Sequence, residues 1–444
     1  MARRRKKQRL PEGVFSARIE SLTHEGKGVT QLDGKVVFID GALPGELVQF
    51  KYVERKRSYD EGIAVEIAEP SVDRVNPECQ YYEVCGGCRL QHLNPKKQIE
   101  NKNSILLENL KRIGKVEPEM VLTPMESSPW GYRRRARLGV KFVAKKEKVL
   151  VGFREKNSSF LADISSCKVL DSRIGNKLND LSELIRSLSL YMRIPQIEVA
   201  IGDNEVGLVF RHLDDLPESD EEKLVAFAKQ HSFYVFGQAK GPDTIKRLWG
   251  PNENNLSFSL PEQDVALNFR PSDFTQVNIE INRKMVTLAL ELLQLSSEDR
   301  VLDLFCGLGN FTIPLARKAN YVVGVEGSHD LVAQANLNAE LNQVKNLDFF
   351  AVDLTKSLEC HLWAQTSYSK ILVDPPRSGA FEVMGLIAGL GAERIVYVSC
   401  NPATLARDAN ELVNVYGYRL SKAGVMDMFP HTAHVESIAV FEKK

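Results

Sequence analysis

The 444-residue chain has no long apolar run, and this absence argues against a membrane protein. No apolar stretch approaches the roughly 20 residues that a transmembrane helix needs. Residues 1–9 carry six basic side chains, but no apolar segment follows them, so the pattern of a secretory signal is missing. We therefore expect a cytoplasmic protein that is not bound to a membrane.

The chain also lacks net charge, with 58 Lys and Arg against 58 Asp and Glu. These charges are unevenly spread, because residues 1–160 hold 31 basic and 21 acidic side chains, and the remainder is acidic by the same margin. A basic front half suggests a surface that meets a polyanion such as nucleic acid. An ordinary solvated basic tail is the simpler explanation.

Cysteine is scarce, and its odd count of seven argues against a framework of disulfides. Three of the seven, Cys79, Cys85 and Cys88, lie within ten residues of one another. Such a cluster predicts a metal site, and its spacing alone fits zinc nearly as well as an iron–sulfur centre.

The length predicts two to four domains, and the sequence pattern divides the chain into parts. About five short strands with turns such as Asp33-Gly34 predict a small OB-like β-barrel. A mixed, strand-rich central part follows and carries the cysteine cluster. Asn94-Pro95 predicts the start of a helix over 95–113, which could pack on the last domain. The expected parts are a basic tail (1–11), the barrel (12–70), the central domain (71–265) and a catalytic domain (266–444).

Helices and short apolar strands alternate after residue 283, which predicts a parallel, Rossmann-like α/β sheet. The strand 300–304 runs into the glycine-rich turn 305–311, and the next strand ends at Glu326. An acidic residue at the end of the strand that follows the glycine-rich turn can accept both hydroxyls of a ribose. A dinucleotide site would have a third glycine where this chain has Thr312, so the pattern favours S-adenosylmethionine.

A candidate nucleophile, Cys400, ends the fifth strand, directly before the helix start Asn401-Pro402. The N-terminus of a helix lowers the pKa of a thiol, although a lone cysteine is more often buried and inert. A thiol that adds to carbon 6 of a pyrimidine makes carbon 5 nucleophilic, and a base must later remove the carbon-5 proton. Glu436, His431 and His434 are the candidate bases.

These motifs together resemble the bacterial RNA uracil-C5 methyltransferase family. The resemblance rests on Phe274-Thr275-Gln276-Val277-Asn278, the turn after 300–304, Asp374-Pro375-Pro376-Arg377, the segment 399–408 and the segment 431–437. It implies an S-adenosylmethionine-dependent methyltransferase domain, with Cys400 as nucleophile and Glu436 as base. The cofactor-binding positions that it implies are Gln276, Phe305, Asn310, Glu326, Asp353 and Asp374.

The front of the chain resembles the branch of that family that carries a TRAM barrel and methylates 23S ribosomal RNA. The resemblance implies a [4Fe-4S] cluster on Cys79, Cys85, Cys88 and Cys167, and uridine 1939 of 23S rRNA as the target. Phe274 is expected near the flipped base, and Arg133 and Arg135 are weaker candidates for RNA contacts. We expect a monomer. Uracil methylation in tRNA, and a non-catalytic iron–sulfur RNA-binding protein, are the alternatives.

Overall fold

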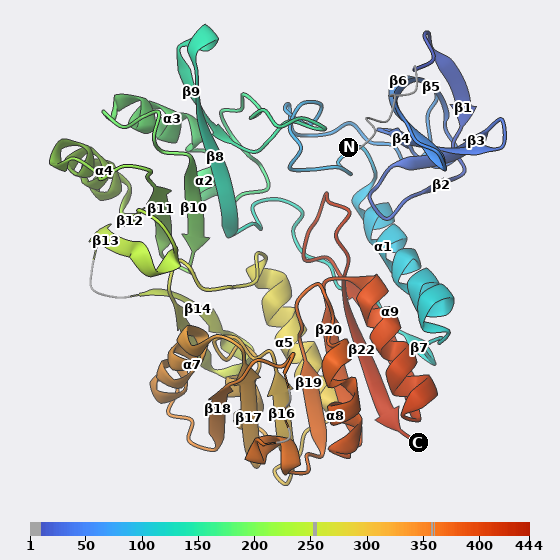
Figure 1. Cartoon of the computed structure of the whole chain (residues 1–444), viewed down its shortest axis with the longest axis vertical. Helices are drawn as coiled ribbons and strands as arrows, with labels where there is room; N and C mark the ends of the chain where they lie inside the picture. The colour runs from blue at the N-terminus through green and yellow to red at the C-terminus, as the bar shows by residue number, and fades with distance from the viewer. Residues whose placement is uncertain (1–9, 252–254, 357, 359) are drawn as a thin grey trace, which may run out of the picture.

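The structure is a computed structural model that describes residues 10–251, 255–356, 358 and 360–444. Most of the expected basic tail, residues 1–9, lies outside the described residues. Figure 1 shows a small β-barrel, a central α/β body and a larger α/β body around a common junction. No helix among the described residues is long and apolar enough to span a bilayer.

The N-terminal barrel is one sheet of six strands, where the sequence indicated about five. Their order in the sheet is β1-β5-β6-β4-β3-β2. The turn between β3 and β4 has positive φ angles at Asp33 (50°) and Gly34 (77°), the geometry that favours a tight hairpin. The strands are β1 (Phe15–Arg18), β2 (Ser21–Leu22), β3 (Gly28–Leu32), β4 (Lys35–Asp40), β5 (Leu47–Arg55) and β6 (Tyr59–Glu69).

The central body holds a six-stranded sheet of order β13-β12-β11-β10-β8-β9, covered by helices. A two-stranded hairpin of β14 (Leu256–Leu260) and β15 (Val265–Phe269) then leads to the last domain. The central elements are β8 (Arg135–Val143), β9 (Lys148–Gly152), α2 (Ser172–Gly175), α3 (Leu178–Ser187), β10 (Gln196–Ile201), β11 (Val206–Arg211), α4 (Glu218–His231), β12 (Tyr234–Gln238) and β13 (Ile245–Trp249).

The last domain is built on an eight-stranded sheet of order β18-β17-β16-β19-β20-β22-β21-β7. Strands β16 to β20 are parallel, and β22 is antiparallel to both of its neighbours. The strands are β7 (Met120–Val121), β16 (Arg300–Leu304), β17 (Tyr321–Glu326), β18 (Leu347–Ala351), β19 (Lys370–Val373), β20 (Arg394–Ser399), β21 (Tyr418–Met426) and β22 (Glu436–Lys443).

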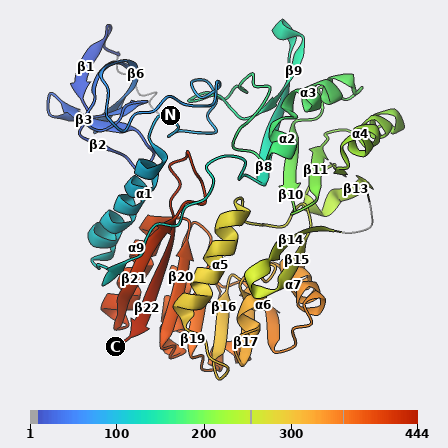
Figure 2. The same ribbon diagram turned by 180° about the vertical axis from the view of Figure 1, so that it is seen from behind.

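Helices cover both faces of this sheet, as buried parallel strands require. Figure 1 shows α8 and α9 on one face, and Figure 2 shows α5 on the opposite face. The helices are α5 (Ile279–Leu293), α6 (Thr312–Ala316), α7 (His329–Leu341), α8 (Met384–Gly389) and α9 (Pro402–Asn410).

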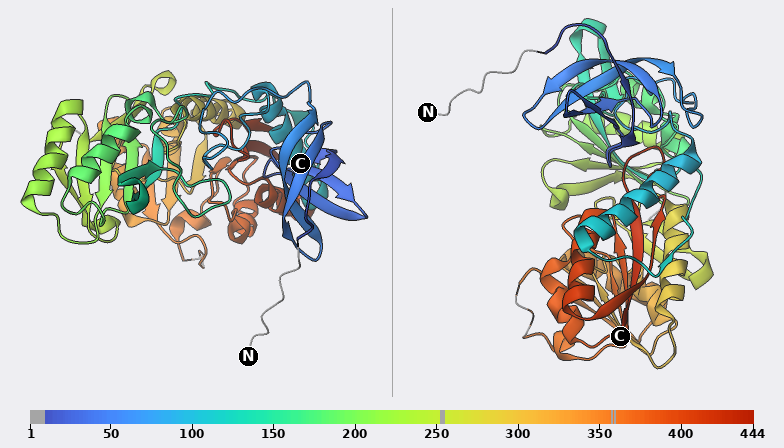
Figure 3. Two further views of the ribbon diagram at one scale, coloured as in Figure 1. Left: turned by 90° about the horizontal axis from the view of Figure 1, so that it is seen from above. Right: turned by 90° about the vertical axis from the view of Figure 1, so that its right-hand side faces the viewer.

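Helix α1 (Pro95–Asn109) follows the cysteine segment in the chain but packs on the last domain. Asn94 caps it by accepting a hydrogen bond from the Lys96 amide at 3.0 Å. Its residues Ile99 and Leu106 belong to the same buried core as Ala406 of α9 and Leu420 of β21. Figure 3 shows α1 lying across the red C-terminal elements, so this helix joins the front of the chain to its end.

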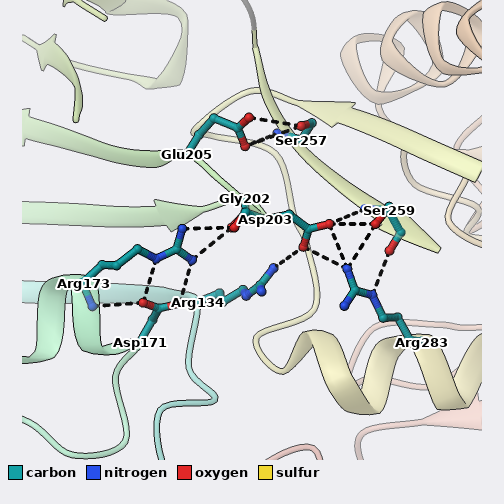
Figure 4. A network of polar contacts seen from close by, with 9 residues as sticks. All are labelled: Arg134, Asp171, Arg173, Gly202, Asp203, Glu205, Ser257, Ser259 and Arg283. Carbon is teal, nitrogen blue, oxygen red and sulfur yellow. Dashed lines mark hydrogen bonds and ion pairs between the residues drawn. The ribbon is translucent and has the colours of Figure 1, made fainter. Parts of the chain in front are cut away.

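A polar network joins the central body to the last domain (Figure 4). Asp203, in the turn between β10 and β11, accepts from Arg134 at 2.7 Å and from Arg283 of α5 at 2.8 Å. Ser259 of the connecting hairpin also donates to Asp203, at 2.8 Å. These side chains are half-buried. Their hydrogen bonds to Asp203 hold α5, and the segment before it, against the central body.

Candidate active site

Cys400 and Glu436 meet at the carboxyl end of the catalytic sheet. Ser399, the last residue of β20, pairs with Ser437 of β22, so the next antiparallel pair brings Cys400 opposite Glu436. The Ser437 hydroxyl donates to the Ser399 carbonyl at 3.2 Å and ties the two strand ends together. Asn401 caps α9 by accepting from the Ala403 amide at 3.1 Å, as the sequence predicted.

The charges around Cys400 differ from the expectation. Burial and the neighbouring carboxylates of Glu436 and Asp374 raise the pKa of the Cys400 thiol to about 11. The predicted lowering by the helix N-terminus was wrong, because desolvation and two acidic neighbours outweigh it. Burial, and then the neighbouring carboxylate of Asp374, raise the pKa of Glu436 well above its ordinary value. Burial alone raises the pKa of Asp374 to about 7.

Arg377 is the cation beside these acidic groups, and the sequence analysis did not count it as a site residue. Its charge opposes the rise in pKa of both Cys400 and Glu436. Its carbonyl accepts from the Asn401 side chain at 3.1 Å, which joins the turn after β19 to the start of α9. The sequence feature that could have identified Arg377 is its place directly after Asp374-Pro375-Pro376, at the edge of the sheet where ligands bind.

The two histidines proposed as rival bases lie in different surroundings. His431 is buried, stacks on Trp130 with ring centroids 4.1 Å apart, and has a pKa lowered by burial to about 4. His434 is exposed, and its Nδ1 lies 3.4 Å from the Arg377 guanidinium. Neither histidine raises or lowers the pKa of the Cys400 thiol in the way that Glu436 does.

The glycine-rich turn after β16 has the form of a ligand cradle. Phe305 and Gly307 have positive φ angles of 65° and 55°. The Gly307 amide donates to the Glu326 carboxylate at 3.2 Å, and the Ser328 amide donates to its other oxygen at 3.0 Å. A carboxylate offers about four acceptor positions, so Glu326 can still accept hydroxyl groups. Open space lies over Gly307, where a side chain would have no neighbour within 4 Å.

The remaining predicted cofactor residues line the same edge of the domain. The amides of Asn310 and Asn282 of α5 form a reciprocal pair, with hydrogen bonds of 3.0 and 2.9 Å. Gln276 is half-buried, just before α5. Asp353, two residues after β18, accepts from the Thr355 hydroxyl at 2.7 Å and pairs with Lys356 at 3.3 Å.

Sequence reasoning missed Asp303, a fully buried carboxyl in strand β16. The Thr312 hydroxyl donates to one of its oxygens at 2.6 Å, and the other oxygen has no hydrogen-bond partner among the described residues. Burial raises the pKa of this carboxyl to about 8. An aspartate inside an apolar strand was the available signal. Its hydrogen-bond partner is Thr312, which the sequence pattern marked only as the position where a dinucleotide site would have a third glycine.

Cys79, Cys85, Cys88 and Cys167 line one cavity, which they share with Arg133 and Phe153. Burial, together with the neighbouring thiols, raises the pKa of Cys88 to about 12 and that of Cys167 to about 11. The Gly87 amide donates to the Cys85 sulfur at 3.4 Å. Within the described part of the chain, no three Cys, His, Asp or Glu side chains converge closely enough to hold a single metal ion.

The predicted RNA-contact residues differ in their exposure. Phe274 is 69% exposed. Arg133 lies over the Phe153 ring, 5.9 Å from its centroid, and donates to the Arg135 carbonyl at 2.9 Å. Arg135 is half-buried and donates to the Pro271 carbonyl at 2.7 Å. Both guanidinium groups therefore have partners within the protein.

The sheet order, with its antiparallel strand β22 inserted beside β20, and the glycine turn define the fold of an S-adenosylmethionine-dependent methyltransferase. A similar structure is that of a tRNA (uracil-54, C5)-methyltransferase from Pyrococcus abyssi in complex with S-adenosyl-L-homocysteine. That structure is 26% identical, with a TM-score of 0.74, and the match covers 96% of this chain and 100% of the other.

Two family models match the chain: tRNA (Uracil-5-)-methyltransferase over residues 94–444, and the TRAM domain over residues 13–65. Curated relatives named 23S rRNA (uracil(1939)-C(5))-methyltransferase RlmD match from end to end. The protein of Alkalilimnicola ehrlichii is 52% identical over 99% of both chains, and that of Methylococcus capsulatus is 51% identical over 100% of both. This chain belongs to the RNA uracil-C5 methyltransferase family, as its motifs predicted.

Proposed function

We propose that this protein transfers a methyl group from S-adenosylmethionine to carbon 5 of a uridine in 23S rRNA, at the position named for its relatives, uridine 1939. The observation that carries the proposal is the apposition of Cys400 and Glu436 at the end of the β20–β22 pair. A thiol and a buried carboxylate, side by side, are the two groups that methylation at a pyrimidine carbon 5 requires.

Cys400 acts first, by adding its sulfur to carbon 6 of the uracil. Its pKa of about 11 keeps the thiol protonated in the free protein, so the proton must leave as the carbon–sulfur bond forms. Asp374 is the adjacent carboxylate that accepts it. The addition moves electron density to carbon 5 and the carbonyl at carbon 4, so carbon 5 becomes the nucleophile. S-adenosylmethionine, when bound, supplies an electrophilic methyl group.

Glu436 acts last, by accepting the carbon-5 proton after methyl transfer. The electrons of that C–H bond re-form the double bond between carbons 5 and 6, and the Cys400 sulfur leaves. A raised pKa makes the ionised form of Glu436 a stronger base than an ordinary carboxylate. Arg377, whose charge favours the ionised forms of both groups, stabilises the negative charge as it moves between them.

The cofactor fits the turn after β16 and the neighbouring strand ends. Glu326 has free acceptor positions for ribose hydroxyls, and the open space over Gly307 leaves room for the approach of a ligand. Gln276, Phe305, Asn310, Asp353 and Asp374 complete the proposed set. Asn310 is held in place by Asn282 of α5.

A [4Fe-4S] cluster on Cys79, Cys85, Cys88 and Cys167 is part of the proposal. Four thiols around one cavity supply the ligands that such a cluster needs. A single zinc ion on the same thiols is the alternative that the cysteine spacing leaves open. Arg133, which lines this cavity, provides a cation beside it.

RNA contacts are proposed for the TRAM barrel and for Phe274. A TRAM domain and an exposed aromatic side chain beside Gln276 suit an unpaired base that leaves its stack. Arg133 and Arg135 are retained as weaker candidates, because each guanidinium would have to exchange a partner within the protein for RNA.

The test is mass-spectrometric mapping of 5-methyluridine in ribosomal and transfer RNA from a deletion strain. The proposal expects loss of the modification at uridine 1939 of 23S rRNA, and its return with the wild-type chain but not with Cys400→Ala. Loss from tRNA alone would identify tRNA as the substrate, as in the Pyrococcus relative. Unchanged 5-methyluridine in both RNAs would favour a non-catalytic RNA-binding protein.

A further inference from the structure

Lys102 of helix α1 is a buried lysine for which the proposed chemistry has no use. Its side chain is 1% exposed, and its Nζ donates to the Asp427 carboxylate at 2.7 Å and to the Phe429 carbonyl at 2.9 Å. Burying a lysine is costly unless its charge is paired, so the site is held by these two bonds. Burial accordingly lowers the pKa of Lys102, while Asp427 opposes that shift.

Both partners of Lys102 belong to residues 427–435, the segment that joins β21 to β22 and ends at Glu436. Met426, the last residue of β21, pairs directly with Glu436. Asp427 is therefore the residue next to the cross-strand neighbour of Glu436. A bond to Asp427 fixes the segment where it leaves the sheet, and a bond to Phe429 fixes its outward path.

Gln98 lies one turn before Lys102 on α1 and holds the same segment further along. Its side-chain oxygen accepts from the His431 amide at 2.9 Å. Its amide nitrogen donates to the carbonyls of Leu90 and Leu93, at 2.9 and 2.8 Å. Gln98 thus connects the segment before Glu436 to the chain that follows Cys88.

The cysteine segment and the central body also form hydrogen bonds with residues 427–435. The amides of Arg89 and Leu90 donate to the His431 carbonyl at 2.8 and 3.0 Å, and the Tyr132 hydroxyl donates to the Pro430 carbonyl at 2.9 Å. Figure 1 shows this red segment rising above the sheet to the junction of the three bodies, beside the start of α1. Its position is therefore set by contacts outside the catalytic sheet.

We propose that Lys102 and Gln98 are positioning residues, which hold residues 427–435 so that Glu436 can reach the carbon-5 proton. This inference rests on the proposed role of Glu436. It implies that the front of the chain takes part in one step of the reaction, the release of the methylated RNA from Cys400. The earlier steps, addition and methyl transfer, use groups on other loops and do not depend on this segment.

The test separates adduct formation from adduct release in single-turnover reactions with methyl-labelled cofactor and an RNA fragment. In Lys102→Met, the labelled protein–RNA adduct should form at close to the wild-type rate. Its release should slow by roughly ten- to a hundredfold, since small misplacements of a reacting group have effects of this size. Lys97→Met is the matched control, because Lys97 lies on the same helix with an exposed side chain paired to Glu100. It should form and release the adduct normally.

A purely structural role for Lys102 is tested by the double variant Lys102→Met/Asp427→Leu. Replacing both partners leaves no unpaired charge buried, so the double variant should regain the stability that Lys102→Met loses. It still lacks the donor to the Phe429 carbonyl, so slow release should persist. If release recovers together with stability, the inference is wrong. Gln98→Leu alters no charge and should also slow release. If either of the other variants fails to fold, Gln98→Leu takes its place in the test.

The outcome also distinguishes this inference from the proposed function. If Glu436→Gln fails to trap the adduct, the assignment of the base is overturned. If Glu436→Gln traps it while the Lys102 and Gln98 variants release it at the wild-type rate, only the positioning role is overturned. Equal slowing of formation and release would also contradict the positioning role, because it would indicate general damage to the site.

Discussion

Cys400 and Glu436 face each other where β20 and β22 end, each one residue beyond the Ser399–Ser437 pair. The Ser399–Ser437 pair directly beside them fixes the register. Substituting either side chain therefore leaves the other in place, because neither contributes a hydrogen bond to that ladder. This property makes single substitutions at the two positions informative about separate steps of the reaction.

Cys400→Ala should abolish formation of 5-methyluridine and leave cofactor binding intact, since no predicted cofactor residue is altered. The measurement is methyl incorporation into 23S rRNA, together with the dissociation constant of S-adenosylmethionine by calorimetry. Cys360→Ala, which removes an exposed thiol, is the control and should be fully active. Appreciable methylation by Cys400→Ala would contradict a covalent mechanism.

Glu436→Gln should trap the methylated RNA on the protein. Glutamine keeps the shape of the side chain but cannot accept the carbon-5 proton, so Cys400 cannot leave. Denaturing gels with methyl-labelled cofactor should show a slow, labelled protein band. His434→Gln and His431→Gln should not accumulate that band to the same extent. Normal turnover by Glu436→Gln, with trapping by a histidine variant, would show that the base is misassigned.

Protein purified without oxygen should be brown and hold iron and sulfide at about four of each per chain. Cys85→Ala should lose this colour and lower the thermal stability of the central body, whose packing includes Cys85. Cys306→Ala is a matched control, because Cys306 is a buried thiol outside the cavity. A colourless protein that contains zinc after anaerobic purification would refute the cluster.

Asp303→Asn should flatten the dependence of stability on pH. Burial raises the folded-state pKa of Asp303 from 3.8 to about 8, so between these values the folded protein holds a proton that the unfolded chain releases. Stability of the wild type therefore falls as pH rises through this window, by at most about 1.4 kcal/mol per pH unit from this group. The amide oxygen of the substituted side chain can still accept from Thr312.

The measurement is urea unfolding of wild type and Asp303→Asn between about pH 5 and pH 8, where the difference in stability should grow in favour of the variant. Asp330→Asn serves as the control, because the Asp330 side chain is 82% exposed. A difference between Asp303→Asn and the wild type that stays constant with pH would show that Asp303 is ionised in the folded protein.

Local patterns in the sequence were sufficient for the parts of the fold that depend on local chemistry. Asn94 and Asn401 cap helices where the sequence placed them, and Asp33-Gly34 forms the expected turn. The environment of a side chain was harder to predict. Cys400 precedes a helix, as expected, yet its pKa rises because the thiol is buried and because β22 brings Glu436 beside it.

The contacts of helix α1 show a second limit. Asn94-Pro95 predicted the start of the helix but could not reveal that Lys102, a polar residue in its sequence, is among its most buried side chains. Its partner Asp427 lies 325 residues away in the chain. Nor could the run Arg133-Arg134-Arg135 reveal which protein groups each guanidinium meets, since those partners come from three separate segments.

The order of the catalytic sheet also constrains how the protein is made. Strand β22 fills the space between β20 and β21, although both precede it in the chain. Until residues 436–443 are made, β20 and β21 each have one strand edge whose partner in the finished sheet does not yet exist. The chain therefore contains Cys400 before it contains Glu436, and the two residues come together only when β22 joins the sheet. Nascent chains that stop short of β22 should be caught by proteases or chaperones that recognise open strand edges, before they can bind RNA unproductively.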